Sequence, residues 1–370
     1  MSCSRWKLLG LLGITLLTAP STHAEVRIGL AAPLTGPYAW GGAWTRGSAE
    51  AAVADLNAGG GVLGEPIEMI VADDYCDGEQ AIAAANKLVA DGAVVVFGHQ
   101  CSGAAIPASE VYAEAGIVMI STGATNPKLT ERGLSSVFRV VGRDDVQGEI
   151  AAELLAERWG DSKIAILHDD QAYGKGLAEE AKKRLNERGV SEVLFEAIAP
   201  GQPEYLDAVR RMQSMGVDVL YYGGYMAEAG LIVRHAADLG YDLQLVGGDG
   251  ISPKDFGLIA GPASDGTLMT RFPPPPETPA ATELKRNSSA DFEPQFESYA
   301  AVQAWAQAAE RAGTFETEAV AEALRSHEFD TVLGRIGFDD KGDVTGYDTF
   351  VWYRWQDGDY APVDPGKLTD

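Results

Sequence analysis

The sequence is poor in positive charge and in histidine, and both shortages exclude classes of function. It has 29 basic residues against 54 acidic ones, which gives a formal net charge of −25. So negative a chain disfavours nucleic acid and anionic membrane surfaces as partners. Of its five histidines, four lie beyond residue 25, and their spacings do not match those of metal ligands: His99, His168, His235 and His327. We therefore predict no bound metal and no cofactor.

The sequence also lacks a hydrophobic run long enough to cross a membrane. The apolar stretch at residues 8–17 is shorter than the roughly 18 residues that a span needs, and no later stretch approaches that length. It follows Arg5 and Lys7 and precedes the small residue Ala24, an order typical of a cleavable secretory signal peptide. We expect residues 1–24 to be removed on export, without direct membrane insertion; the alternative is a buried N-terminal helix.

Cysteine is scarce, with three residues in the chain, and Cys3 lies within the expected signal peptide. The remaining pair, Cys76 and Cys101, predicts a disulfide, because an even number of cysteines in an exported chain usually pairs. A bridge closing a loop of this size contributes roughly 3 kcal/mol of stability. Once bonded, Cys101 is no thiolate nucleophile, whereas two free thiols would leave that role open.

What the sequence has in abundance is alternation of apolar runs with alanine-rich amphipathic stretches. Runs that are apolar on both faces and separated by helices are typical of parallel sheets covered on both sides. The first set of expected strands and helices covers residues 26–32, 43–56, 67–72, 79–90, 94–97, 104–113 and 117–120. The pattern begins again at residues 163–167 and continues to 243–246, so the chain predicts an α/β protein with two doubly wound parallel sheets.

Two breaks interrupt this alternation. One candidate crossing between the lobes is at residues 139–145, and the proline run at 273–276 is incompatible with a helix or an inner strand. A helix at 297–312 and hairpin-like segments at 334–346 follow. Each lobe is therefore expected to contain pieces of chain that are far apart in sequence.

Ligands of open α/β sheets bind beyond the carboxyl ends of the strands. Small residues follow the expected strands of the first half of the chain, whereas tyrosines and a carboxylate follow those of the second half. These residues are Ser102, Gly123 and Thr125 in the first half and Tyr173, Tyr225 and Asp249 in the second. This difference between the two halves suits a small molecule that carries a positive and a negative charge and binds between two lobes.

An enzymatic reading centres on "HQCSG" at residues 99–103. This stretch only loosely matches the G-x-S-x-G nucleophile elbow, because its first glycine is out of register. His99 is expected to be a hydrogen-bonded loop histidine, and no phosphate-binding or dinucleotide-binding glycine motif is present in the sequence. We predict that the protein is not an enzyme, with an exported hydrolase as the distant alternative.

Several longer stretches carry a resemblance to a known family. They are "GHQCSGAAIPASEVYAEAGIVMI" at residues 98–120, "HDDQAYGKGLA" at 168–178, "YYGGYMAEAG" at 221–230 and "DTVLGRIGFDDKGDV" at 330–344, together with residues 73–92. The sequence resembles periplasmic leucine/isoleucine/valine-binding proteins over essentially its whole length after residue 24. These proteins are the substrate-binding components of branched-chain amino acid ABC transporters.

The resemblance implies the type I periplasmic-binding fold, with two lobes joined by a three-strand hinge. The N-terminal lobe would comprise residues 25–143 and 272–347, and the C-terminal lobe residues 144–271 and 348–370. It further implies a periplasmic monomer that captures an aliphatic L-amino acid, leucine, isoleucine or valine, and delivers it to the membrane permease subunits. The alternative is another small metabolite on the same fold, such as an amide, urea or an aromatic acid.

The resemblance also assigns roles to single residues. Ser102 and Thr125 would bind the ligand α-carboxylate with help from the Gly123 backbone, Tyr173 and Tyr225 would contact the ligand from the second lobe, and Asp249 would pair with the α-ammonium. Cys76 and Cys101 would form the family disulfide. Hydroxyls and backbone N–H groups at a helix start suit a carboxylate without an arginine, and a carboxylate suits an ammonium.

Three positions depart from the family pattern. Asp249 replaces the usual glutamate and is one methylene shorter, Trp40 in "YAWGGAW" lies close to an aromatic wall position, and Gln100 stands where an apolar residue is expected. Other readings remain open: Ser102 as a helix cap, the two tyrosines as surface aromatics, and Asp249 as a turn residue before Gly250.

Overall fold

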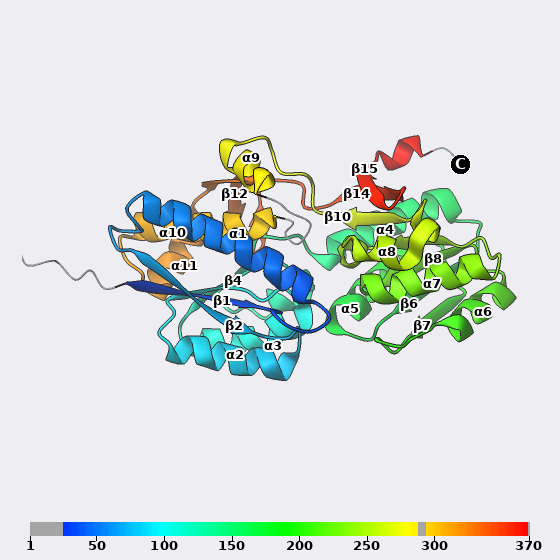
Figure 1. The fold of residues 1–370 in the computed structure, drawn as a ribbon, viewed down its shortest axis with the longest axis horizontal. Coiled ribbons are helices and arrows are strands. Elements are labelled where there is room, and N and C mark those ends of the chain that lie inside the picture. Colours follow the sequence, from blue (N-terminus) through cyan, green and yellow to red (C-terminus); the bar gives the residue numbers. More distant parts are fainter. Residues whose placement is uncertain (1–24, 288–293, 369–370) are drawn as a thin grey trace, which may run out of the picture.

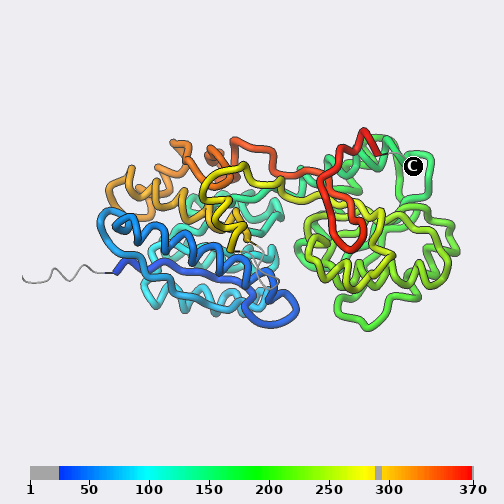
Figure 2. Tube along the Cα trace, turned by 45° about the horizontal axis from the view of Figure 1, so that its top comes forward, coloured from blue at the N-terminus to red at the C-terminus, as the bar shows by residue number. Residues whose placement is uncertain are grey.

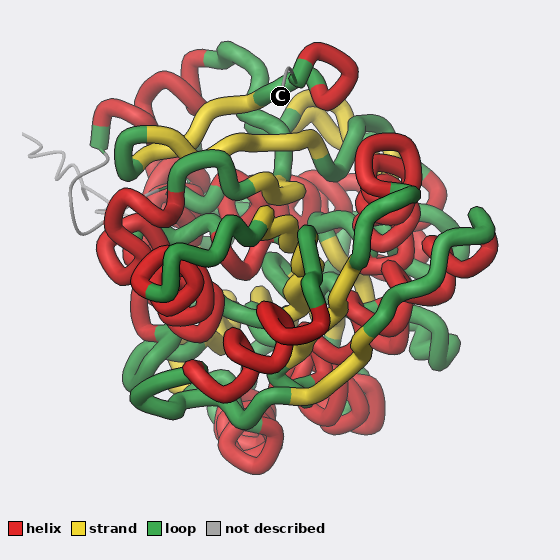
Figure 3. The backbone as a smooth tube through the Cα atoms, turned by 90° about the vertical axis from the view of Figure 1, so that its right-hand side faces the viewer, coloured by secondary structure: helices red, strands yellow, loops and turns green. Residues whose placement is uncertain are grey.

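The computed structural model describes residues 25–287 and 294–368, so the expected signal peptide lies outside the described residues. The chain forms two lobes that lie side by side, each built around its own sheet (Figure 1). We call them the first and the second lobe. Figure 3, which looks along the long axis, shows helices surrounding the strands. No helix in the described part of the chain has the length and apolarity to cross a membrane.

The sheet of the first lobe is entirely parallel, in the order β2-β1-β3-β4-β5. Its strands are β1 (Val26–Ala32), β2 (Ile67–Asp73), β3 (Val95–Gly98), β4 (Val118–Ser121) and β5 (Val137–Arg139). The connecting helices are α1 (Ala39–Ala58), α2 (Gly78–Ala90) and α3 (Ser102–Glu114). Strands β3, β4 and β5 and most of β1 are buried on both faces, which explains their continuous apolar runs, whereas the edge strand β2 is mostly half-buried.

Helices from both ends of the chain cover this first sheet. In Figure 1, α2 and α3 lie below it, whereas α1, α10 (Phe296–Ala312) and α11 (Thr317–Ser326) lie above it. The ring of Trp305 on α10 packs edge-on against Phe97 of β3, with centroids 6.0 Å apart. The small sheet of β11 (Phe329–Thr331), β12 (Gly334–Phe338) and β13 (Val344–Thr345) contains the expected hairpin, with β12 and β13 antiparallel.

The sheet of the second lobe has the order β15-β14-β10-β9-β8-β6-β7. Its parallel strands are β6 (Ile164–His168), β7 (Leu194–Ala197), β8 (Val219–Gly223), β9 (Gln244–Gly247) and β10 (Leu268–Arg271). Its helices are α4 (Asp144–Trp159), α5 (Ala172–Glu187), α6 (Leu206–Met215), α7 (Met226–Asp238) and α8 (Asp255–Ala260).

The second sheet is mixed, and this corrects the expectation of a wholly parallel one. The hairpin β14 (Val351–Gln356) and β15 (Asp359–Pro362) joins its edge, with β14 antiparallel to β10. Asp357 and Gly358 form the turn, both with positive φ (54° and 76°). A two-residue loop with this backbone favours Asp-Gly, so the sequence carried a hairpin signal that the parallel pattern obscured.

Three stretches of chain pass between the lobes. They connect β5 to α4, β10 to α9 (Pro279–Arg286), and β13 to β14, and Figure 2 shows the last two, yellow and orange, running together. The Tyr347 hydroxyl donates to the carbonyl of Val140 (2.7 Å), and the rings of Phe272 and Phe350 lie 5.4 Å apart. The crossings therefore pack against one another. The exact lobe boundaries at residues 143, 271 and 347 stay a prediction.

Candidate functional site

A cavity lies between the lobes at the carboxyl ends of the parallel strands. Its volume is about 120 Å³, and part of it is open to solvent. The first lobe contributes Tyr38, Trp40, Trp44, Gln100, Cys101, Ser102, Gly123, Pro294, Gln295, Phe296 and Glu297. The second lobe and the β10–α9 crossing contribute Tyr173, Tyr225, Asp249, Gly250, Ser252, Arg271, Phe272 and Pro273–Pro275. Six of the seven predicted ligand-binding residues line this cavity, the exception being Thr125.

On the first lobe, helix α3 begins at the cavity wall. Its N-cap residue is Cys101, which makes no side-chain cap, and the Ser102 hydroxyl accepts a hydrogen bond from the Asn126 N–H (3.2 Å). The alternative that Ser102 caps the helix is therefore wrong. The first N–H groups of a helix have no intrahelical acceptor, so this end offers donors and a partial positive charge to the cavity.

Gly123 lies next to the α3 start and faces the same cavity. A Cβ at this position would lie 2.6 Å from Gln100 Cγ and 3.0 Å from its carbonyl oxygen. Only glycine therefore lets the loop after β4 pack so closely on the loop after β3.

Thr125 is the predicted residue that the structure does not place in the cavity wall. Its side chain is buried, and its hydroxyl lies near the carboxylate of Asp144, where it opposes the rise in pKa that burial causes. Its carbonyl accepts from the backbone N–H of Asp144 (2.9 Å), which ties the first lobe to the start of α4. A contact between Thr125 and a ligand carboxylate stays a prediction.

On the second lobe, Tyr173 and Asp249 form a hydrogen-bonded unit. The Tyr173 hydroxyl donates to Asp249 Oδ1 (3.0 Å) and accepts from the Gly250 N–H (2.9 Å). The Tyr225 ring lies 5.1 Å from that of Tyr173 and 4.6 Å from Tyr38 of the first lobe. Both tyrosines are thus part of the cavity rather than surface aromatics. Asp249 is the first residue of a short 3-10 helix and also lines the cavity. It is therefore both a turn residue and a residue of the candidate site.

A second carboxylate, which the sequence analysis missed, lies behind Asp249. Gln147 Nε2 donates to Asp249 Oδ1 (2.8 Å) and to Asp144 Oδ1 (3.2 Å), and Gln147 Oε1 accepts from the Thr270 hydroxyl (2.6 Å). Asp144 is fully buried, and the Thr125 hydroxyl of the first lobe lies close enough to its carboxylate to oppose the rise in its pKa that burial causes. The sequence signal that could have indicated Asp144 is its position at the start of helix α4, directly after a crossing between the lobes.

Burial raises the pKa of Asp249, and burial together with the Asp249 charge raises the pKa of Asp144 well above its ordinary value. The Arg271 charge acts in the opposite direction on the pKa of Asp249. Two carboxylates sharing one amide donor disfavour each other's ionisation and attract a cation. An ammonium group in the cavity would stabilise their ionised form.

Aromatic rings form another part of the wall. Trp40 lines the cavity as predicted, with its ring 4.9 Å from that of Trp44, and its indole N–H is buried without a hydrogen-bond partner within residues 25–287 and 294–368. Tyr38 and Trp44 belong to the same "YAWGGAW" stretch but were not singled out from the sequence. Burial raises the pKa of Tyr38 to about 12, so its hydroxyl stays protonated at neutral pH.

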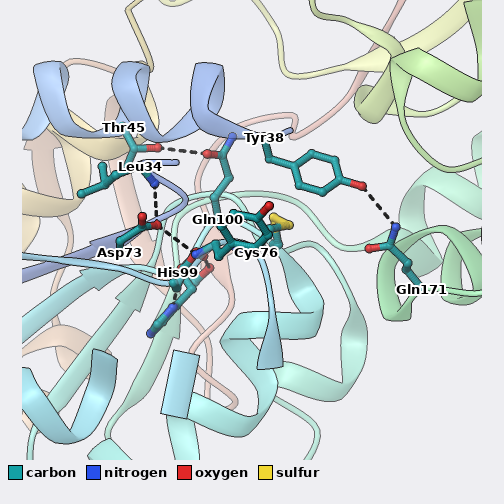
Figure 4. The surroundings of a disulfide bond; sticks show 12 residues. Leu34, Tyr38, Thr45, Asp73, Cys76, His99, Gln100 and Gln171 are labelled. Carbon is teal, nitrogen blue, oxygen red and sulfur yellow. Dashed lines mark hydrogen bonds and ion pairs between the residues drawn. A yellow bond between two sulfur atoms is a disulfide. The ribbon is translucent and has the colours of Figure 1, made fainter. Parts of the chain in front are cut away.

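The lobes touch each other around the mouth of the cavity. Gln171 Nε2 donates to the Tyr38 hydroxyl across the cleft (3.1 Å; Figure 4), and Asn126 Nδ2 donates to the carbonyl of Ala172 (2.6 Å). These contacts join β–α loops of one lobe to helix α5 of the other. The two lobes are therefore in direct contact through these loops.

Cys101 and His99, which an enzymatic mechanism would use, form bonds within the protein instead. Cys76 and Cys101 form a disulfide, so Cys101 is no thiolate (Figure 4). His99 is fully buried, with Nδ1 2.6 Å from Asp74 Oδ2 and Nε2 3.1 Å from the Tyr112 hydroxyl, and it does not line the cavity. No group of three or more candidate metal ligands occurs among the described residues.

Comparison with known proteins agrees with this architecture. A family model described as periplasmic binding protein matches residues 25–359. The Leu/Ile/Val-binding protein homolog 1 of Brucella suis is 46% identical over 347 residues, which cover 92% of this chain and 94% of the relative.

Two solved structures share the fold. A leucine-binding protein from Thermotoga maritima has a TM-score of 0.82 and 25% identity, covering 93% of this chain and all of that one. A branched-chain amino acid transporter substrate-binding protein from Streptococcus pneumoniae, in complex with isoleucine, has a TM-score of 0.79 and 25% identity over 92% of this chain and all of that one. The fold is that of the type I periplasmic binding proteins, and the chain belongs to the periplasmic binding protein family, whose members are binding proteins rather than enzymes.

Proposed function

We propose that this protein is the substrate-binding component of an ABC transporter and captures a branched-chain L-amino acid, leucine, isoleucine or valine, between its two lobes. The observation that carries the proposal is the division of charge across the cavity. Helix α3 offers N–H groups and the Ser102 hydroxyl from the first lobe, whereas Asp249 offers a carboxylate from the second. An amino acid head group has the complementary carboxylate and ammonium.

In this proposal the ligand carboxylate lies at the start of α3, near Ser102 and the backbone of Gly123, with Thr125 contributing from behind. The ammonium lies against Asp249, which Tyr173 and Gln147 hold in place by hydrogen bonds of 3.0 and 2.8 Å. Charge-assisted hydrogen bonds of this kind are roughly twice as strong as neutral ones. Trp40 and Tyr225 enclose the side chain.

The names of the relatives support the same ligand class and setting. The Brucella protein is a homolog of Leu/Ile/Val-binding protein, and the Streptococcus protein serves a branched-chain amino acid transporter. We therefore infer that this chain works as a periplasmic monomer after removal of residues 1–24 and passes its ligand to membrane permease subunits.

A thermal-shift screen of the purified protein tests the proposal. Leucine, isoleucine and valine should raise the melting temperature, because a ligand that binds only the folded state stabilises it by an amount that grows with the logarithm of its concentration over Kd. Benzoate, acetamide and urea serve as comparison ligands on the same fold. Stabilisation by these compounds with none by any amino acid would reject the proposal, and turnover of a stabilising ligand would favour the hydrolase alternative.

A further inference from the structure

Gln100 places a polar amide in the cavity wall where the ligand side chain would lie. It comes directly after β3, is half-buried, and extends toward Thr45 on helix α1 (Figure 4). Trp40, Trp44 and Gln295 line the same cavity. Asp249, the proposed contact of the ammonium, belongs to the wall of the other lobe.

Two glycines make room for this amide. A Cβ at Gly41 would lie 2.4 Å from both terminal atoms of Gln100, and a Cβ at Gly123 would lie 2.6 Å from its Cγ. Real Cβ atoms do not approach other atoms so closely, so any side chain at either position would displace Gln100. Gly41 lies on helix α1, and Gly123 lies in the loop after β4. The absence of a side chain at both positions leaves the space that the long side chain of Gln100 occupies.

The hydrogen bonds of the amide are not all satisfied by the protein. Thr45 has a single hydroxyl hydrogen and three acceptors within reach: the carbonyl of Gly41 (2.9 Å), Oε1 of Gln100 (3.4 Å) and Oε1 of Gln295. Gln295 is held in its orientation, because its Nε2 donates to the carbonyl of Thr122 (2.6 Å). No described residue accepts a hydrogen bond from Gln100 Nε2.

Either orientation of the Gln100 amide leaves hydrogen-bonding capacity toward the cavity. If Nε2 turned to donate to Thr45, then Oε1 would take its place beside the cavity as a free acceptor. A purely aliphatic ligand side chain would displace water from this amide and leave it unpaired, which is costly in a buried site. A ligand side chain with its own hydroxyl or amide would replace the lost hydrogen bond.

We propose that Gln100 is a specificity-determining residue that admits amino acids of valine or leucine size whose side chains carry a hydrogen-bonding group. Threonine and asparagine represent this class, since they nearly match valine and leucine in shape but are polar. The inference rests on the proposed amino acid function and concerns only the side-chain compartment. Asparagine and threonine should therefore bind with affinities comparable to those of their apolar counterparts.

Calorimetric titration with the pairs leucine/asparagine and valine/threonine tests this inference. Gln100→Met removes the amide at nearly constant length, and Gln100→Leu does so with a smaller side chain. In at least one pair, both variants should shift the Kd ratio about tenfold toward the apolar ligand, the effect of one buried hydrogen bond. Gln80→Met, the same change at an exposed position on α2 of the same lobe, should leave the ratios unchanged.

The outcomes separate this inference from the proposed function. If the amino acids bind but the ratios of both pairs are the same in wild type, Gln100→Met and Gln100→Leu, then the inference is wrong and the proposed function stands. If no amino acid binds the wild-type protein, both are overturned. A shift of the same size in Gln80→Met would also overturn the inference, because the effect would not then come from the cavity.

Discussion

The two lobes contribute different head-group contacts to the cavity. The first lobe presents the start of α3 and the hydroxyl of Ser102, with Glu297 also in its wall, whereas the second lobe presents the carboxylate of Asp249 backed by Asp144, with Arg271 also in its wall. Helix N–H groups are fixed by the backbone and need no partner to keep their charge. A buried carboxylate needs hydrogen-bond donors around it, and Tyr173 and Gln147 supply them.

The lobes also differ in how they treat their buried carboxylates. In the first lobe the fully buried Asp74 lies 2.6 Å from a ring nitrogen of His99 and accepts from the Cys76 N–H (2.8 Å). In the second lobe Asp169 accepts from the Gln171 N–H (3.0 Å) with one oxygen, and its other buried oxygen has no hydrogen-bond partner among the described residues. Asp74 is therefore held by protein partners, whereas burial without full pairing raises the pKa of Asp169.

Removing the second lobe's charge should have the largest effect on binding. Asp249→Asn would leave the ligand ammonium without its anionic partner and cost about 2–5 kcal/mol of binding free energy, as for buried charge pairs at interfaces. Calorimetric titration with leucine measures this loss. Asp242→Asn, at an exposed position of the same lobe, is the matched control. Unchanged affinity in Asp249→Asn would mean that the ammonium is held elsewhere.

The partly paired, buried carboxylate of Asp169 should also make the stability of the protein depend on pH. Burial raises the pKa of Asp169 to about 7 from the ordinary 3.8. The folded state therefore binds more protons than the unfolded state between these values, so stability falls as pH rises from about 4 to 7. Asp169→Asn should be more stable than wild type by roughly 2–4 kcal/mol above pH 7 and equally stable near pH 4.

Denaturant unfolding at several pH values would measure that difference. Asp170→Asn is the control, because Asp170 is adjacent, exposed and paired with Lys175, which lowers its pKa. A gain for Asp169→Asn that is constant from pH 4 to pH 8 would contradict the explanation by a raised pKa.

On the first lobe, Ser102→Ala should weaken binding by about 1.5–3 kcal/mol, the usual contribution of a hydrogen bond to a charged group. The melting temperature of the ligand-free protein should change little, since the hydroxyl only accepts from one N–H of Asn126. Ser109→Ala, on the same helix but away from the cavity, is the control. Equal losses of affinity in both variants would place the effect in the helix rather than in the ligand contact.

The smallest expected effect concerns the contact between the lobes. A Cβ at Gly176 on α5 would lie 2.5 Å from Asn126 Nδ2 of the other lobe, so Gly176→Ala should disturb the Asn126–Ala172 hydrogen bond and weaken ligand binding by about 1 kcal/mol. At Gly103, which also faces the other lobe, a Cβ would lie 4.0 Å from Ala172. Gly103→Ala should bind as wild type does, and an equal loss in both would contradict a role for this contact in closure.

Much of the fold and most of the candidate site could be predicted from the sequence, for a physical reason. Parallel strands are apolar runs, and their carboxyl ends meet at one edge, so residues such as Ser102, Tyr173 and Asp249 could be grouped without coordinates. The antiparallel β14–β15 hairpin was missed because it comes after the repeating pattern of parallel strands and helices. The pairing of β14 with β10 depends on where the third crossing, from β13 to β14, enters the second lobe.

The residues that support the site could not be predicted in the same way. Gln147 and Asp249 are separated by 102 positions, and nothing in either local sequence indicates that they share a hydrogen bond. Tyr38 reaches Gln171 only because the lobes lie close together. Thr125 shows the converse, since its position after a strand placed it in the predicted site while the structure buries it beside α4.

The most direct test of the account is whether Asp249 acts on the ligand's ammonium alone. Wild type and Asp249→Asn should be titrated with leucine and with 4-methylpentanoate, which is leucine without its amino group. The account predicts that the substitution weakens leucine binding by about 2–5 kcal/mol but leaves 4-methylpentanoate binding unchanged or improved, because the acid has no cation for Asp249 to pair with. Equal losses for both ligands would contradict the account.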